Sequence, residues 1–137
     1  MKKLLVFLIQ FFLCLISYSQ IQMYKSTEVG ICKLKNGQKT TAMKWMDCPY
    51  VAVIVDYGKG NIFVNSREKR LFKITKVYDP EFTNAYTLYK YDTKDLKGKK
   101  VVVALSMIKN DAQDWEIGFI DSGYYYVYKM NVNKTNN

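Results

Sequence analysis

Hydrophobic positions in this chain occur as short β-branched and aromatic runs separated by polar turns. Residues 50–56, 61–65 and 70–77 form three such runs. The segments between them, 57–60 and 66–69, are rich in glycine or in charge, which is typical of hairpin turns. This part of the chain therefore predicts antiparallel strands joined by tight connections.

Further runs of the same kind lie on both sides of this segment, at 31–34, 39–46, 85–91, 99–108, 115–120 and 124–132. Asn36-Gly37 lies between the first two, and Asn-Gly is the strongest two-residue hairpin signal because both positions tolerate positive φ. Residues 21–30 are mixed in character and fit either a flexible lead-in or a first edge strand.

No stretch of about 11 residues or more after Gln20 has helical periodicity. About eight short strands with turn signals between them indicate an all-β domain. The expected architecture is a single antiparallel meander that closes as a small lipocalin-like barrel, with a β-sandwich as the alternative. Two strands, 50–56 and 101–105, are apolar on both faces, so we expect them to be covered on both sides.

The first residues have the composition of a secretory signal peptide. Lys2 and Lys3 precede the apolar segment 4–16, and the small residues Ser17 and Ser19 follow it. A transmembrane helix or a buried helix is the alternative, but a membrane span needs roughly 20 apolar residues. We therefore expect a signal peptide at 1–19 and one β domain at 20–137, with 131–137 as a frayed tail.

Cleavage of this segment would place the protein outside the cytoplasm, in the periplasm, on the outer surface or in the medium. No transmembrane segment is expected after cleavage, because no later run approaches the length of a span. Cys14 is preceded by the bulky Leu13. This disfavours lipid attachment at that cysteine.

The remaining cysteines are Cys32 and Cys48. An even pair in an oxidising compartment predicts a disulfide, which would stabilise the fold by roughly 3 kcal/mol in the chain-entropy view. Two buried free thiols are the alternative. Two cysteines without a histidine do not make a zinc site, so we expect no metal.

The chain contains no histidine. This excludes Ser-His-Asp and Cys-His nucleophilic schemes and histidine-based metal sites. No glycine-rich phosphate loop or dinucleotide motif occurs. The acidic residues Asp111, Asp114 and Glu116, like Asp92 and Asp95, fit solvated turns better than a catalytic carboxylate pair. We therefore expect a protein that is not an enzyme and that carries no cofactor.

The formal net charge of +9 indicates an anionic partner. Basic side chains concentrate in two groups: Arg67, Lys69, Arg70 and Lys73, and Lys97, Lys99 and Lys100. Lipid headgroups, lipopolysaccharide or acidic glycans suit an exported protein better than nucleic acid, which is not expected as a partner. The alternative is that lysines at turns and edges prevent edge-to-edge pairing of strands.

The chain is also rich in tyrosine. The aromatic candidates for a surface that binds a ligand or partner are Trp45, Tyr86, Trp115, Tyr124, Tyr126 and Tyr128. Such rings suit stacking on a glycan, an interface with an envelope protein, or a barrel mouth that holds a small apolar ligand. The alternative is that they pack in the core and across neighbouring strands.

Four segments, at 45–56, 62–66, 71–74 and 115–128, carry the strand patterns WMDCPYVAVIVD, IFVNS, LFKI and WEIGFIDSGYYYVY. These patterns resemble a group of small exported β-rich proteins of the Bacteroidota, over about residues 41–130. The resemblance implies export to the envelope and a lipocalin-like or related small barrel. Because the motifs are strand patterns and the group has no assigned activity, the resemblance implies no functional residue.

These observations predict an exported, non-enzymatic binding protein of the cell envelope that holds a ligand or partner through an aromatic face or a barrel mouth. The alternative is a structural or protein-interaction protein of the envelope, a class that includes inhibitors and immunity factors. An apolar cavity inside the barrel would favour the first function. A filled core beside an exposed patch of several hundred Å² would favour the second.

Overall fold

The computed structural model describes residues 21–108 and 114–132, and every regular element in these ranges is a β-strand. The strands are β1 (Ile21–Lys35), β2 (Gln38–Lys39), β3 (Lys44–Asp47), β4 (Ala52–Asp56), β5 (Asn61–Asn65), β6 (Arg70–Val77), β7 (Glu81–Phe82), β8 (Tyr86–Lys94), β9 (Lys100–Ile108), β10 (Asp114–Asp121) and β11 (Tyr124–Val132). The predicted signal peptide, Cys14, Asp111 and all but the first two residues of the predicted tail lie outside the described ranges. Those two residues, Asn131 and Val132, belong to β11.

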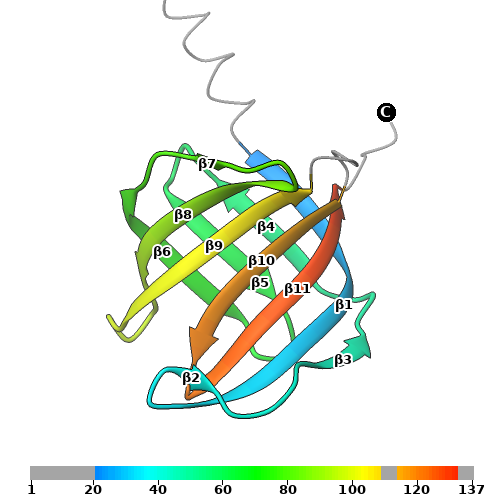
Figure 1. Ribbon diagram of the computed structural model, residues 1–137. Coiled ribbons are helices and arrows are strands. Elements are labelled where there is room, and N and C mark those ends of the chain that lie inside the picture. Colours follow the sequence, from blue (N-terminus) through cyan, green and yellow to red (C-terminus); the bar gives the residue numbers. More distant parts are fainter. Residues whose placement is uncertain (1–20, 109–113, 133–137) are drawn as a thin grey trace, which may run out of the picture.

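Eight of the strands form a closed antiparallel barrel (Figure 1). Their order around the ring is β1, β4, β5, β6, β8, β9, β10 and β11, and β11 pairs again with β1. The short strands lie outside the ring: β2 and β3 pair with β1, and β7 pairs with β8. The ring confirms the predicted all-β meander and barrel. It excludes the sandwich, because the first and last strands are hydrogen-bonded to each other.

β1 closes the ring, although residues 21–30 gave no clear strand pattern. Residues 21–25 pair with β4, and residues 28–31 pair with β3. A bulge between Ser26 and Glu28 shifts the register against β11. A bulge inserts an unpaired residue and changes the phase of the side-chain alternation. The segment is therefore neither a lead-in nor an edge strand, but a strand paired on both sides.

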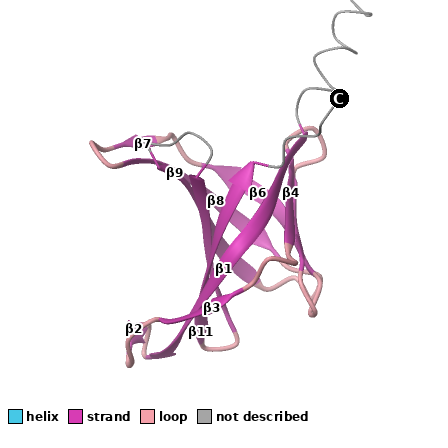
Figure 2. Cartoon of the chain, turned by 90° about the vertical axis from the view of Figure 1, so that its right-hand side faces the viewer, coloured by secondary structure: helices cyan, strands magenta, loops and turns pink. Residues whose placement is uncertain are grey.

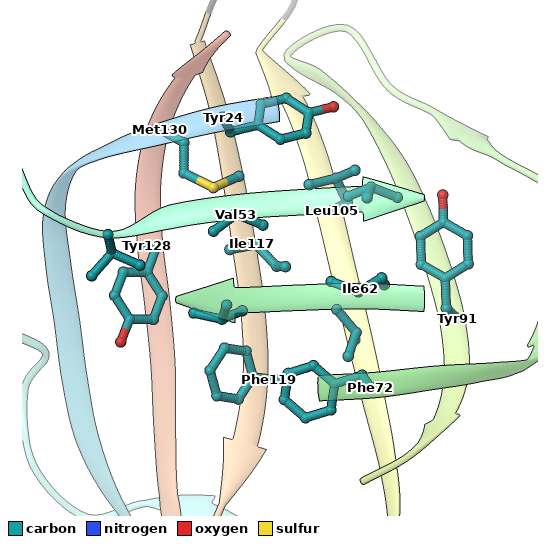
Figure 3. Close-up of a cluster of buried hydrophobic side chains, with 14 of the residues drawn as sticks. Tyr24, Val53, Ile62, Phe72, Tyr91, Leu105, Ile117, Phe119, Tyr128 and Met130 are labelled. Atoms are coloured by element: carbon teal, nitrogen blue, oxygen red, sulfur yellow. The ribbon is translucent and has the colours of Figure 1, made fainter. Parts of the chain in front are cut away.

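The barrel interior is packed with side chains from all the strands of the ring (Figure 3). Val53, Ile62, Leu105 and Ile117 have no surface that water can reach. Burying an aliphatic side chain of this size contributes about 1.5–3 kcal/mol. Inward and outward residues alternate along each strand, so this single core runs along the barrel axis.

In the part of the chain that the structure describes, no second layer of strands covers the outer wall of the barrel. Val102 is 54% exposed, although its neighbours Val101 and Val103 are buried. Ala52 and Ile54 are partly exposed on β4. The prediction that both faces of these strands are covered is therefore wrong, because a barrel made of one sheet buries only its inward-facing residues. Their outward β-branched side chains reflect strand propensity instead.

The two ends of the barrel have different connections (Figures 1 and 2). The lower end, as seen in Figure 1, consists of the turns that follow β1, β5, β8 and β10. The upper end has the turn after β4, the segment that contains β7, and the start of β1. Asn36 and Gly37 at the lower end have positive φ, so the predicted Asn-Gly turn is confirmed. The return strand predicted at 39–46 is wrong in its bounds, because the chain forms the short β2 and the separate β3 instead.

Candidate functional site

The centre of the barrel is packed with buried side chains, several of them aromatic. The ring of Phe119 lies 5.1 Å from that of Phe72, 5.5 Å from that of Tyr126 and 6.2 Å from that of Tyr128, measured between centroids. Figure 3 shows Phe119 and Phe72 facing each other in the lower half of the core. Tilted and stacked rings at such distances are favourable aromatic contacts. Of the candidate binding residues, Tyr128 is thus part of the core, and Tyr126 is partly buried against it.

The other aromatic candidates are distributed over three environments. Trp115 packs against the core, with its ring 5.3 Å from that of Tyr24. Tyr124 is 39% exposed at the lower end. Tyr86 and Trp45 are partly exposed, and the ammonium of Lys129 lies 4.1 Å from the ring centre of Trp45. The six aromatic candidates therefore do not form one binding face.

The basic candidates are also divided, because Arg70 faces the barrel mouth. Its side chain is only 11% exposed, and its guanidinium lies 5.5 Å from the ring centre of Phe119 and 4.9 Å from that of Tyr126. Its Nε donates to Asp121 Oδ2 at 3.2 Å, and Nη2 donates to Glu68 Oε2 at the same distance. Arg70 is therefore a neutralised cation that covers the lower end of the core.

Asp121 is held in its charged form by this arrangement. Partial burial alone would raise its pKa. Hydrogen bonds from Arg70 and Ser122, together with the charges of Arg70 and Lys99, outweigh burial and hold the pKa of Asp121 below its usual value. The ion pair with Arg70 is thus present throughout the neutral pH range.

Lys73 faces outward and belongs to a row that strand pairing creates. It lies directly opposite Lys94 on β8, and Lys94 lies directly opposite Lys100 on β9. All three side chains are exposed. We call Lys73, Lys94 and Lys100 the lysine row. Like charges directly opposite each other are destabilising, by roughly 0.2–1 kcal/mol per pair.

The turn after β8 has a fixed conformation that presents apolar and basic side chains together. Asp95 Oδ1 accepts hydrogen bonds from the backbone N–H groups of Lys97 and Lys99, both at 2.9 Å. Gly98 has a φ of 77°, a value that other residues rarely adopt. Leu96 is 77% exposed on this turn. Its neighbours thus hold Leu96 at the tip without any contribution from the barrel core.

Basic side chains outnumber acidic ones at the lower end. The basic residues there are Lys33, Lys35, Lys39, Arg67, Lys69, Arg70, Lys73, Lys94, Lys97, Lys99 and Lys100. The acidic residues there are Glu68, Asp95 and Asp121, and each of them already accepts a hydrogen bond from the protein. The lower end is therefore a surface of uncompensated positive charge.

The upper end is closer to neutral, because the acidic residues Asp56, Asp79, Glu81, Asp114 and Glu116 lie toward it together with Lys25, Lys59, Lys76 and Lys90. The protein is thus polarised along the barrel axis, which orients it in the field of a charged partner.

A hollow of about 380 Å³ opens at the lower end, between the turns after β5, β8 and β10. Lys69, Lys97 and Lys99 contribute basic groups to its wall, and Phe72 and Val101 contribute apolar surface. A second hollow, of about 510 Å³, lies on β1, β10 and β11 and includes Glu28, Asp114 and Glu116. Both hollows contain apolar and charged groups, but among the described residues basic ones outnumber acidic ones only in the wall of the first, whereas Lys129 is the one basic residue in the wall of the second.

The predicted disulfide is absent, and both cysteines are free thiols. The backbone N–H of Cys48 donates to the Thr27 carbonyl on β1. Cys32 lies further along the same strand, about 16 Å from Thr27 at the rise per residue of an extended strand. A disulfide needs Cα atoms within about 7 Å. Cys48 packs against the core, and the Cys32 thiol contacts the Thr41 carbonyl at 3.0 Å. The prediction was wrong because sequence spacing does not reveal this separation.

Within residues 21–108 and 114–132, no group of three or more cysteine, aspartate or glutamate side chains is placed to hold a metal ion. The same ranges contain no helix of the length and apolarity needed to cross a membrane. Comparison with protein families, with curated proteins and with solved structures gives no match for the chain. The resemblance to small exported proteins of the Bacteroidota therefore stays a prediction.

Proposed function

We propose that this chain is an exported, non-enzymatic binding protein of the cell envelope, and that its lower end binds an anionic partner. The leader-like residues 1–19 support export, and the excess of basic residues at the lower end supports an anionic partner. The filled interior supports a surface site over an enclosed apolar ligand. Of the aromatic residues predicted to bind a ligand, Tyr128 belongs to that interior, and Trp115 and Tyr126 pack against it.

The lysine row is the observation that carries this proposal. Lysines on exposed edges can be explained as protection against strand pairing. That explanation does not apply to Lys73 and Lys94, because each of them is paired with a neighbouring strand on both sides, and Lys100 begins a strand that pairs with both β8 and β10 further along. Three like charges in register cost stability. An anionic partner that lies across the row would offset this cost.

Titration with inorganic polyphosphate tests the proposal. The wild-type protein should bind, and binding should weaken steeply as salt rises because exposed charges are screened beyond about 10 Å at 0.1 M ionic strength. Changing all three lysines of the row to Gln should weaken binding by about tenfold or more. The matched control changes Lys25, Lys59 and Lys76, which are exposed outside the lower end. An equal loss in both triple variants would show that net charge alone decides binding and would remove the proposed site.

A second candidate function, a structural or inhibitory protein-interaction role, is favoured by one apolar site on the outer wall. Val102 is 54% exposed on β9 and Ile120 is 50% exposed on β10. Because Phe119 pairs with Val103, these two residues occupy the next position along the same strand pair. A protein partner that co-purifies with the wild type and is lost with Val102→Lys, but is retained by the lysine-row variant, would establish this function instead.

A further inference from the structure

Leu96 occupies an unusual position for a large apolar residue. It is 77% exposed at the tip of the turn between β8 and β9. Lys97, Lys99 and Lys100 follow it within the next few residues, and Lys94 precedes it. A leucine held in water at the centre of a cationic turn gains nothing from the fold itself. It does fit a partner that offers both anionic groups and apolar surface.

The turn that carries Leu96 is already ordered, so it would lose little conformational entropy on binding. Asp95 accepts the backbone N–H groups of Lys97 and Lys99, and the Asp95 N–H donates to the Lys99 carbonyl at 2.9 Å. Ordering a flexible loop costs free energy that binding must supply, whereas a preformed turn avoids most of that cost. The tip is therefore preorganised for contact.

The rim around Leu96 has the composition of an interfacial surface. Lys69 lies on the neighbouring turn, and the hollow of about 380 Å³ is lined by Leu96 itself and by residues of three turns. Tyr124 is 39% exposed at the start of β11, at the same end. Tyrosine is enriched where one side is apolar and the other is wet, and lysine can extend its ammonium along an apolar surface toward charged groups.

The upper end provides a comparison within the same molecule. Phe82 there is 73% exposed, and Val77 is 65% exposed. Their neighbours in the chain include Asp79 and Glu81, and Glu81 pairs with Lys90 at 3.7 Å. An anionic surface would repel the carboxylates that lie beside these exposed apolar groups. Among the described residues, Val77 and Tyr57 at the upper end each have one exposed lysine close by in the chain, Lys76 and Lys59, whereas Leu96 has several lysines around it.

We infer that the lower end docks on an anionic lipid surface, with Leu96 entering the boundary between headgroups and acyl chains and the surrounding lysines contacting lipid phosphates. This inference rests on the proposed function and names the class of its anionic partner. A soluble polyanion would account for the lysines but not for the exposed leucine. A lipid surface accounts for both, because interfacial binding adds apolar burial to electrostatic attraction.

The experiment measures binding to vesicles in two compositions, phosphatidylcholine alone and phosphatidylcholine mixed with phosphatidylglycerol, with inorganic polyphosphate as a soluble probe. The protein is used in the form that cells accumulate, so any leader residue is common to all variants. Lys97→Gln with Lys99→Gln should weaken binding to anionic vesicles about 25-fold, since each lysine near such a surface contributes about fivefold. Leu96→Ala should weaken vesicle binding about tenfold and leave polyphosphate binding unchanged.

Two control variants are matched to these changes. Phe82→Ala removes an exposed apolar group, and Lys25→Gln with Lys59→Gln removes the same charge, both away from the lower end; neither should change vesicle binding by more than about twofold. Circular dichroism of each variant confirms that the barrel is retained.

Each outcome decides between the two proposals. If Leu96→Ala binds vesicles as tightly as the wild type, while the lysine variants lose both vesicles and polyphosphate, the lipid inference is overturned and the anionic-partner proposal stands. If the wild type binds neither probe, or if the lysine variants bind both as the wild type does, both proposals are overturned.

Discussion

The two ends of the barrel cover the same apolar core with different chemistry. At the lower end the guanidinium of Arg70 lies over the rings of Phe119 and Tyr126 and is neutralised by Asp121. A charged group can cover a core only if its partners satisfy it. Because Asp121 and Glu68 both pair with Arg70, the other basic side chains on the surrounding turns remain available to solvent and partners.

At the upper end the core is covered by neutral rings. The ring of Trp115 lies 5.3 Å from that of Tyr24 and 6.0 Å from that of Tyr89. Burial, followed by interactions with Tyr57 and Tyr89, raises the pKa of Tyr24 well above its ordinary value of 10.0. The pKa of Tyr91 is raised by burial and by a hydrogen bond with Tyr57. We therefore expect acid pH to destabilise the lower end and alkaline pH to destabilise the upper end.

The largest effect is expected at Phe119, which supports the lower end from within. Phe119 is 1% exposed and contacts three aromatic rings as well as Arg70. Phe119→Ala should lower the free energy of unfolding by about 3–5 kcal/mol, because it leaves a cavity under the ion pair. Urea titration followed by circular dichroism measures this. Phe82→Ala, at a residue that is 73% exposed, should change it by less than about 0.5 kcal/mol.

Alkaline pH should act on the upper end. The folded-state pKa values of Tyr24 and Tyr91 lie above the ordinary value of 10.0, so the stability they contribute is fully present below pH 10 and is lost as pH rises further. The loss should approach about 1.4 kcal/mol per pH unit for each tyrosine. Tyr91→Phe should reduce this slope in unfolding experiments above pH 10. Tyr86→Phe, at an exposed ring, serves as the control, and an equal change there would contradict the assignment.

Acid pH should act on the lower end, with a smaller effect. The pKa of Asp121 is lowered in the folded protein, so its contribution is present above its ordinary value of 3.8 and is lost as pH falls through the lower folded value. Asp121→Asn should cost about 1–2 kcal/mol at neutral pH, a partly exposed pair being weaker than a buried one. It should also make the free energy of unfolding less dependent on pH in the acid range. Glu81→Gln, which breaks the exposed 3.7 Å pair with Lys90, should do neither.

The smallest expected effect is an increase in stability. Lys94 lies between two other lysines on the outer wall. Lys94→Gln should raise the free energy of unfolding by roughly 0.2–1 kcal/mol, because it removes repulsion on both sides. High salt should abolish the gain by screening the charges. Thermal unfolding of Lys94→Gln and of the control Lys25→Gln, at low and high salt, measures the difference. A loss of stability in Lys94→Gln would show that the row is not repulsive.

Strands β4 to β6 and β8 to β11 could be predicted from the sequence because their signals are local. Val53 and Val55 alternate with their neighbours, and Gly60, Gly98 and Gly123 take positive φ in the turns. β1 was not clear, since its bulge at Ser26 breaks the alternation and places a small polar side chain inside. Its pairing with β11 depends on the far end of the chain.

The candidate site could be predicted only in part. The grouping of Arg67, Lys69, Arg70 and Lys73 identified the lower end, but it treated residues on opposite faces of β6 as one patch. Phe72 faces inward, so strand alternation places Arg70 inside the mouth and Lys73 outside. The lysine row could not be found by spacing, because a bulge between Ile74 and Lys76 sets the register of β6 against β8.

The pairing of β1 with β11 also determines when the protein can fold. Tyr24 lies opposite Val132, so the residues that close the ring come from the two extremes of the described chain. Loop closure over such a distance is entropically costly and makes folding slow. During synthesis, β1 can pair with β2, β3 and β4, but its pairing with β11 must wait until β11 has left the ribosome. The sheet therefore remains open, with two unpaired edges, for as long as the chain is incomplete.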